Sequence, residues 1–137
     1  MDKKFESRII AALRKLTKQY PPILKVKKKT RIGPELHICP LCNQTIYTGK
    51  RSIDSIKIEF PDAIEGKMEV DHIDPIIAIE DSGKDKDWNR LINRMFCEED
   101  NLQNICSICH KLKTALEKQE RQEFLKKQKG KNSGEVD

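Results

Sequence analysis

Four cysteines stand in two pairs whose spacing is typical of a metal site. Two residues separate Cys39 from Cys42 and Cys106 from Cys109, and 63 residues lie between the pairs. Thiolates at this spacing can bind one ion from a tight turn, and four of them complete the tetrahedral shell of structural zinc. Four ordinary buried cysteines are the alternative, but two such pairs in one short chain favour Zn²⁺. A closed shell leaves no open position, so this ion is predicted to be structural.

A second set of residues could perform hydrolytic chemistry. Asp71 and His72 are adjacent in a segment with the alternation of a strand, so their side chains are expected on opposite faces. One can then bind a metal ion while the other acts as a base. His110 follows Cys109 directly and can lie near the zinc without binding it. Together with Asp71 it would leave most of an octahedral shell open, as a catalytic divalent cation requires.

The remaining polar candidates carry weaker signals. A lone histidine is more often structural than catalytic, and His37 has only its closeness to a cysteine in its favour. Cys97 has no partner at ligand spacing and is interpreted as a small core residue. His72 and His110 differ from these because an acid, an asparagine and a cysteine pair stand beside them.

Short regular elements are expected to position both sets of residues. Alternation predicts strands over 68–73 and 102–105, and apolar spacing predicts helices over 3–18 and 88–95. A last helix is predicted from Ser107 to about Lys127. Its inner stripe is expected to consist of Ile108, Leu112, Ala115, Leu116 and Gln119.

Three segments are harder to assign. Residues 23–31 are strongly basic without a clear period, and an extended arm along a phosphate backbone is favoured over a solvated linker. Residues 43–67 favour neither a strand nor a loop. Residues 128–137 are polar with two glycines and predict a disordered tail. The expected nucleic-acid contacts of the arm are Lys25, Lys27, Lys28, Lys29 and Arg31.

Composition suits one small domain with basic extensions. Among 137 residues, 36% are charged and 5% are aromatic, so the hydrophobic core is expected to be small. A small core usually needs additional stabilisation, such as a bound zinc ion. Residues 1–37 carry eleven Lys or Arg against three acids, 38–110 carry eight against fourteen, and 111–131 carry eight against three. Basic arms around an acidic middle favour a nucleic-acid partner, although solvated basic faces are the plain alternative. No membrane span or secretory signal is expected, which favours the cytoplasm.

These motifs together resemble the HNH endonucleases, in particular the small zinc-containing HNH proteins of bacteriophages and prophages. The resemblance covers residues 39–42 and about 68–114. It is carried by Cys39-x-x-Cys42, Val70-Asp71-His72-Ile73-x-Pro75, Trp88-x-x-Leu91-Ile92-x-Arg94-Met95-Phe96-Cys97 and Asp100-Asn101-Leu102-Gln103-x-x-Cys106-x-x-Cys109-His110-x-x-Lys113-Thr114.

The resemblance implies an α+β fold with a small ββα-metal (His-Me finger) core and a four-cysteine zinc site. Residues 1–37 would form a basic helix and arm, 38–127 the nuclease domain and 128–137 the tail. His72 would be the general base, Asp71 and His110 would bind Mg²⁺, Mn²⁺ or Ni²⁺, and Asn101 would hold the loop and the imidazole. Asn104 competes for the last role, but it lies within the expected strand whereas Asn101 precedes it.

The implied function is a metal-dependent DNA endonuclease or nickase. Lysine and arginine contacts to phosphate carry no base readout, so the basic arms predict little sequence preference. By analogy it would act in phage DNA processing or packaging with terminase subunits, in the cytoplasm of a bacterial host. A homing or restriction role also stays open. The alternative from another class is a non-enzymatic zinc-knuckle module that binds nucleic acid, which would not need Asp71, His72, Asn101 and His110.

Overall fold

Two paired strands form the centre of the molecule. The computed structural model describes residues 1–134, a mixed α+β protein. Strand β5 (Met68–His72) pairs antiparallel with β6 (Leu102–Cys106), with Met68 opposite Cys106 and His72 opposite Leu102. Helix α5 (Ser107–Gly134) begins at the residue after β6. The backbone N–H of Ser107 donates to the carbonyl of Lys67 at 2.9 Å, which ties the start of α5 to the residue before β5.

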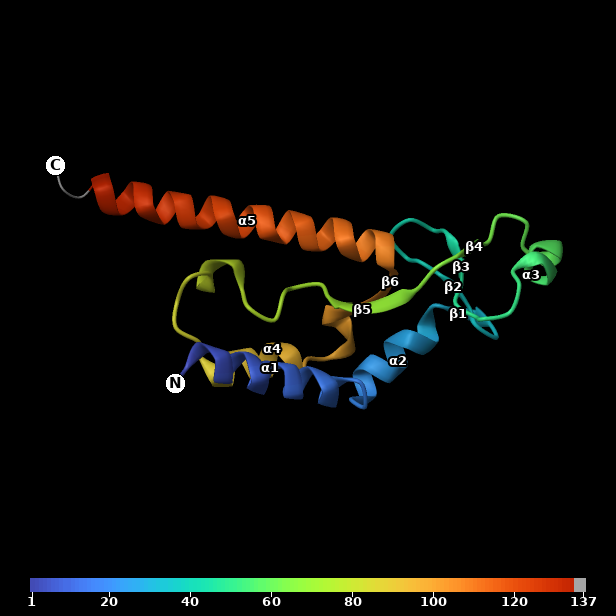
Figure 1. Cartoon of the computed structure of the whole chain (residues 1–137), viewed down its shortest axis with the longest axis horizontal. Coiled ribbons are helices and arrows are strands. Elements are labelled where there is room, and N and C mark those ends of the chain that lie inside the picture. The colour runs from blue at the N-terminus through green and yellow to red at the C-terminus, as the bar shows by residue number, and fades with distance from the viewer. Residues whose placement is uncertain (135–137) are drawn as a thin grey trace.

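Different helices cover the two faces of this pair (Figure 1). Helix α2 (Pro21–Lys29) buries Ile23 and Val26 against Leu102, and Val70 and Cys97 pack on the same cluster. Cys97 is thus a small residue at the edge of the core, as predicted. Helix α5 lies on the other side, where Asp71 points. The alternation of β5 therefore separates an apolar face from a polar one.

A second sheet consists of four short strands, β1 (Arg31–Gly33), β2 (Leu36–Ile38), β3 (Thr45–Tyr47) and β4 (Ile64–Glu65), in that order. Two of them, β3 and β4, lie in the segment 43–67 that the sequence left unassigned. Helix α3 (Asp54–Glu59) connects β3 to β4 and has no buried residue. Ile46 of β3 is buried with Cys39, Ile105 and Cys106, so the small sheet packs against the end of β6.

The two remaining helices lie where the apolar spacing predicts them. Helix α1 spans Lys3–Thr17, and the Asp2 side chain caps it by accepting from the N–H of Lys4 at 3.0 Å. Helix α4 spans Trp88–Met95, is capped by Asp87 and buries Leu91 and Met95. Short 3₁₀ turns η1 (Ile79–Asp81) and η2 (Glu99–Asn101) complete the long connection between β5 and β6.

The prediction of an extended basic arm over residues 23–31 is wrong for residues 23–29, which belong to α2. Pro21 and Pro22 occupy its first turn, where proline is tolerated because the N–H is unpaired there anyway. Ile23 and Val26, three positions apart, reach the core from one helical face. The lysines between and after them are exposed.

The predicted inner stripe of α5 is also wrong. Ile108, Leu112 and Leu116 are 60%, 62% and 59% exposed. The inward face instead carries His110, Lys113, Glu117, Arg121 and Phe124. The reason is that α5 meets the body through carboxylates of β5 and loop carbonyls rather than through an apolar surface.

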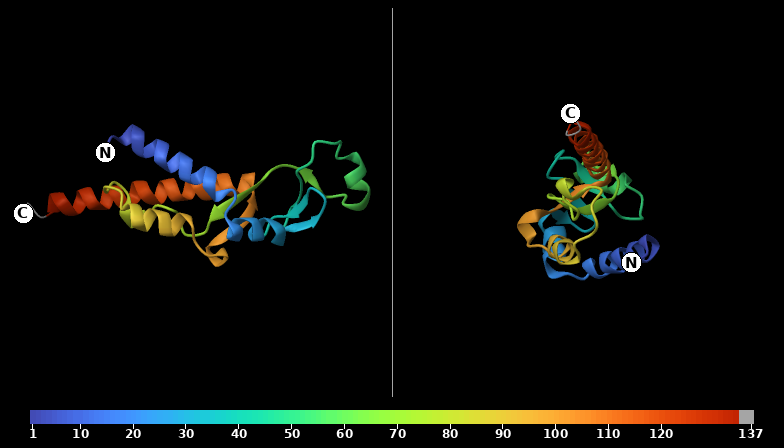
Figure 2. Two further views of the ribbon diagram at one scale, coloured as in Figure 1. Left: turned by 90° about the horizontal axis from the view of Figure 1, so that it is seen from below. Right: turned by 90° about the vertical axis from the view of Figure 1, so that its left-hand side faces the viewer.

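Helix α5 also continues past the expected end at about Lys127. The predicted tail is helical from 128 to 134, and residues 135–137 lie outside the described residues. Figures 1 and 2 place its C-terminal end at the same end of the molecule as the start of α1, far from α3. No helix within residues 1–134 has the length and apolar character that crossing a bilayer requires.

Candidate functional site

Four cysteine sulfurs come together where β6 meets α5. The Sγ atoms of Cys39, Cys42, Cys106 and Cys109 all lie within 4.8 Å of one another, and those of Cys42 and Cys106 are 3.8 Å apart. Zinc–sulfur bonds of about 2.3 Å in a tetrahedron put neighbouring sulfurs about 3.8 Å apart. The cluster can therefore hold a zinc ion with little rearrangement.

Local backbone geometry builds the first half of this cluster. The N–H of Asn43 donates to the carbonyl of Cys39 at 2.8 Å, and Asn43 adopts a left-handed conformation with φ of 59°. Asparagine tolerates this conformation better than most residues. The N–H of Cys106 donates to the Cys39 sulfur at 3.4 Å. A backbone hydrogen bond thus closes the turn from Cys39 to Asn43, and the Cys39 sulfur connects this turn to β6.

The thiols differ in how readily they ionise. Burial raises the pKa of Cys39, but backbone N–H groups of Cys106, Cys42 and Leu41 outweigh it and lower the pKa to about 7. Burial and the neighbouring thiols raise the pKa of Cys109 to about 12. Four thiolates without a cation repel one another, so the donor set fits a bound divalent ion that supplies the missing positive charge.

A second polar cluster lies on the α5 face of β5. The His110 Nδ1 atom is 2.9 Å from a carboxylate oxygen of Glu69, and Nε2 is 3.9 Å from Oδ1 of Asp71. An ionised carboxylate only accepts, so Nδ1 carries a proton; in the neutral ring the lone pair is then on Nε2, the nitrogen that faces Asp71. A carboxylate behind a histidine in this way is a common support for a metal ligand.

The other oxygen of Asp71 is fully engaged. Oδ2 accepts from the Gln103 side chain at 2.9 Å and lies 3.0 Å from Nζ of Lys113. Burial on its own would lower the pKa of Lys113, but its bonds to Glu117 and Asp71 outweigh burial and raise the pKa. Lys113 therefore stays protonated, and Oδ1 is left as the oxygen of Asp71 that faces His110.

His72 reaches away from this cluster, towards α4. Its Nε2 atom lies 2.8 Å from the backbone carbonyl of Met95. Because a carbonyl oxygen only accepts, Nε2 carries the proton and the lone pair of the neutral ring is on Nδ1. The backbone carbonyl of His72 accepts from Lys113 at 2.8 Å. Asp71 and His72 thus use opposite faces of β5, but both still line one cavity.

That cavity of about 420 Å³ lies between α1, β5 and α5. It brings together three of the four residues expected to be catalytic, Asp71, His72 and His110. Its walls also include Arg14 and Arg121. A volume of this size is typical of a pocket that takes a small ligand, about 300–1,000 Å³.

Asn101 supports the loop that follows β5. Its Oδ1 accepts from the N–H of Asp74 at 2.8 Å, its Nδ2 donates to the carbonyl of Asp74 at 3.3 Å, and its backbone carbonyl accepts from Ile73 at 2.9 Å. It lies beside the cavity rather than in it. Asn104 points to the opposite side, where its Nδ2 donates to the Thr30 hydroxyl at 2.9 Å.

The weaker candidates lie elsewhere. His37 contacts the same Thr30 hydroxyl at 2.9 Å, and burial, with the charge of Arg31, lowers its pKa. None of the five basic residues between 25 and 31 lines the cavity. They belong to α2 and the start of β1, and α2 covers the face of the strand pair opposite α5.

Sequence reasoning missed Glu69, Lys113 in its contact with Asp71, and Arg94. Glu69 is two positions before Asp71 and therefore on the same strand face, which is the signal that could have found it. Arg94 donates from Nε to the carbonyls of Pro75 and Ile76 and pairs with Asp74 at 2.9 Å. It fixes the loop that forms part of the cavity wall, a role that no spacing rule reveals.

Comparison with known proteins assigns the chain to no family. Comparison of the chain with protein-family models, curated sequences and solved structures found no match.

Proposed function

We propose that the protein is a metal-dependent HNH-type DNA endonuclease or nickase. The observation that carries the proposal is the pairing of Asp71 Oδ1 with His110 Nε2 at 3.9 Å, with Glu69 behind the imidazole. Two ligands of one ion with bonds of about 2.1 Å lie about 3.0 Å apart at a right angle and about 4.2 Å apart across the ion. The observed separation falls within this range, so a shared divalent cation fits.

The proposed chemistry divides between the two faces of β5. His72, with Nε2 bonded to Met95, offers Nδ1 as general base to a water that attacks the scissile phosphorus. Asp71 and His110 would hold Mg²⁺ or another divalent cation such as Mn²⁺ or Ni²⁺, which would offset the negative charge that develops on the phosphate. Asn101 keeps the loop after His72 in place. By the resemblance, the products carry a 5′-phosphate and a 3′-hydroxyl.

The order of elements agrees with this proposal. Two antiparallel strands followed at once by a helix match the ββα-metal arrangement that the resemblance implies, with residues 73–101 inserted between the strands. The cluster of four cysteines would carry structural Zn²⁺. The same resemblance suggests that the protein acts with terminase subunits in phage DNA packaging. A pull-down with those subunits tests this role.

Plasmid cleavage with a panel of divalent cations tests the proposal. His72→Ala should lower the rate at least about 100-fold, because a positioned base contributes roughly 10²–10⁴. His37→Ala is the matched control, since His37 bonds Thr30 and does not line the cavity. Zinc content and circular dichroism should stay unchanged in both. Equal cleavage by the parent and His72→Ala would refute His72 as the base.

One observation favours a second candidate, a nucleic-acid-binding zinc module without activity. Lys113 already neutralises Asp71 at 3.0 Å, so the cluster is also satisfied as an ion-pair network. On this alternative the parent cleaves no DNA with any cation, but still binds it. The same plasmid experiment therefore separates the two candidates.

A further inference from the structure

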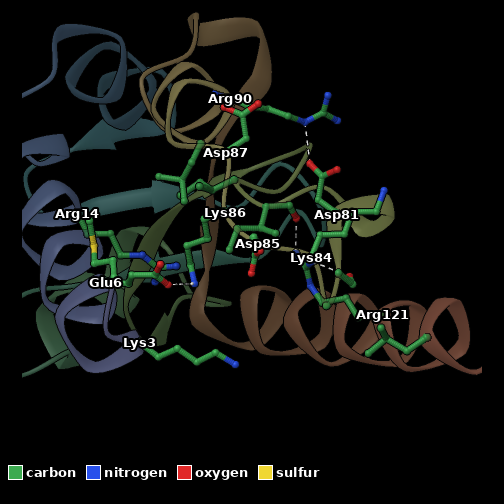
Figure 3. A pocket seen from close by; sticks show the side chains of 17 residues that line it. Lys3, Glu6, Arg14, Asp81, Lys84, Asp85, Lys86, Asp87, Arg90 and Arg121 are labelled. Carbon is green, nitrogen blue, oxygen red and sulfur yellow. Dashed lines mark hydrogen bonds and ion pairs between the residues drawn. The ribbon is translucent and has the colours of Figure 1, made fainter. Parts of the chain in front are cut away.

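Arg14 lies at the junction of two cavities and pairs with no acid among residues 1–130. A larger cavity, of about 910 Å³, adjoins the one that holds Asp71, His72 and His110, and the two share Arg14, Ile76, Ile77 and Arg121. Figure 3 shows Arg14 and Arg121 among the side chains of the larger cavity. The shared residues make the two cavities parts of one groove between α1 and α5.

The other guanidinium at this junction is not available to a ligand. Arg121 donates to the carbonyls of Ala78 and Ile77 and, at 3.2 Å, to the Ser82 hydroxyl. It fastens η1 to α5. Among residues 1–130, the side chain of Arg14 has no hydrogen-bond or ion-pair partner, and it is exposed. Of the two arginines, Arg14 is therefore the one whose charge is uncompensated.

The acids of the larger cavity do not compensate Arg14 either. Glu6 pairs with Lys86 at 3.2 Å, and Asp81 pairs with Arg90 at 2.7 Å (Figure 3). Asp85 and Asp87 also line this cavity, and neither forms an ion pair with Arg14; Asp87 accepts from the backbone N–H of Arg90 at 3.1 Å as the cap of α4. Arg14 thus faces the groove without a protein carboxylate bound to it.

Polar contacts hold α1 over the groove. No residue of α1 is buried, so packing alone does not fix it. The Glu6–Lys86 pair ties its first half to the loop before α4, with side chains only 17% and 28% exposed. After the last turn, Tyr20 stacks edge-on against Phe96 with ring centroids 5.3 Å apart. The Tyr20 hydroxyl donates to the Phe96 carbonyl at 3.2 Å. Arg14, in the second half of α1, is held between these anchors.

We infer that Arg14 binds the phosphodiester that reacts in the cavity of Asp71, His72 and His110. This inference rests on the proposed nuclease function and adds a substrate-binding residue to it. A guanidinium can bind two phosphate oxygens at once, and its charge opposes the charge that grows on them during attack. The lysines of α2 do not line the cavity, so they can bind only other phosphates of a long strand.

A substrate with a single phosphate distinguishes these roles. Bis(4-nitrophenyl) phosphate and a labelled DNA oligonucleotide are offered to the parent with Mn²⁺. Arg14→Ala should lower kcat/KM about 10- to 100-fold on both substrates, and Arg14→Lys should restore part of it. Lys15→Ala, the neighbouring exposed residue of α1, should change neither rate. Lys25→Ala should weaken DNA binding but leave the small diester unaffected.

The outcomes separate the inference from the function on which it rests. If the parent hydrolyses both substrates and Arg14→Ala equals it on the small diester, the inference is overturned and the nuclease function stands. If the parent hydrolyses neither substrate with any divalent cation, the proposed function fails and the inference fails with it. Zinc content and circular dichroism of Arg14→Ala, matched to the parent, ensure that a lost rate is not lost folding.

Discussion

Glu69 is the residue on which the orientation of His110 depends. Its carboxylate lies 2.9 Å from Nδ1 and leaves Nε2 facing Asp71. Without it the ring of His110, which is 34% exposed, could rotate about its side-chain bonds or change its protonated nitrogen. The lone pair would then no longer be fixed in the direction of Asp71.

Glu69→Ala should therefore weaken binding of the proposed catalytic cation. Loss of such a supporting carboxylate lowers metal affinity or activity by about 10- to 100-fold. Glu69→Gln should lose less, because its amide oxygen still accepts from Nδ1. The Mn²⁺ concentration that gives half-maximal cleavage measures the effect, with Glu65→Ala on β4 as control. If Glu69→Ala needs no more Mn²⁺ than the parent, Glu69 does not support a metal ligand.

At the scale of single residues, the sequence supplied ligands but not their partners. The cysteine pairs were found from spacing alone because two ligands within one turn leave a local pattern. The bonds of Asp71 to Gln103 and Lys113 depend on the register of β5 with β6 and on how α5 is rotated. Register and rotation are set by long-range packing, so no local pattern records them.

Helix α5 shows how an element can be predicted with the wrong side facing inward. Its existence and start follow from the apolar spacing and the cysteine pair, but its apolar stripe faces solvent. The inward side is selected by Asp71, Glu69 and the carbonyls of residues 77 and 78, which all need polar partners. Spacing arguments assume that the core-facing side is apolar, and this helix does not meet that assumption.

The junction of β6 with α5 should depend on zinc. Cys106→Ser removes a ligand and should cause loss of the ion and unfolding, because structural zinc in small domains contributes on the order of 10 kcal/mol. That is comparable to the whole stability of a typical domain, about 5–15 kcal/mol. Zinc analysis and thermal unfolding measure both effects. Cys97→Ser, outside the cluster, is the control and should keep its zinc; a stable zinc-free Cys106→Ser protein would contradict a structural role.

The whole molecule separates its charges. The acidic middle of the sequence supplies Glu69 and Asp71, whereas the basic first and last parts form α1, α2 and most of α5. The cavities lie between α1 and α5, so basic helices flank the site on both sides (Figure 2). This distribution was readable from the sequence. The sequence did not reveal that α2 is a helix packed on the strand pair, because two buried residues are too few to show a helical period.

Binding of DNA should weaken steeply as salt rises. If the five basic residues from Lys25 to Arg31 each contact a phosphate, the slope of log K against log salt is roughly −4.5, a loss of about 500-fold between 50 and 200 mM. Anisotropy with the inactive His72→Ala protein measures it. Lys27→Ala should flatten the slope by about 0.9, while Lys57→Ala on the distant α3 should leave it unchanged. A slope near zero would show that the basic residues of α2 do not contact the DNA phosphates.

The absence of a linker between β6 and α5 limits where the chain can change its length. Cys106 is the last residue of β6, and His110 lies in the first turn or so of α5. One residue inserted between them would turn everything after it by about 100° around the helix axis. His110 would leave the face of Asp71, and Arg121 would leave the carbonyls that it binds. Insertions in the exposed loops around α3, or between η1 and α4, change no such angle. The spacing from Cys106 to His110 therefore sets the positions of both the four-cysteine cluster and the pair of His110 with Asp71.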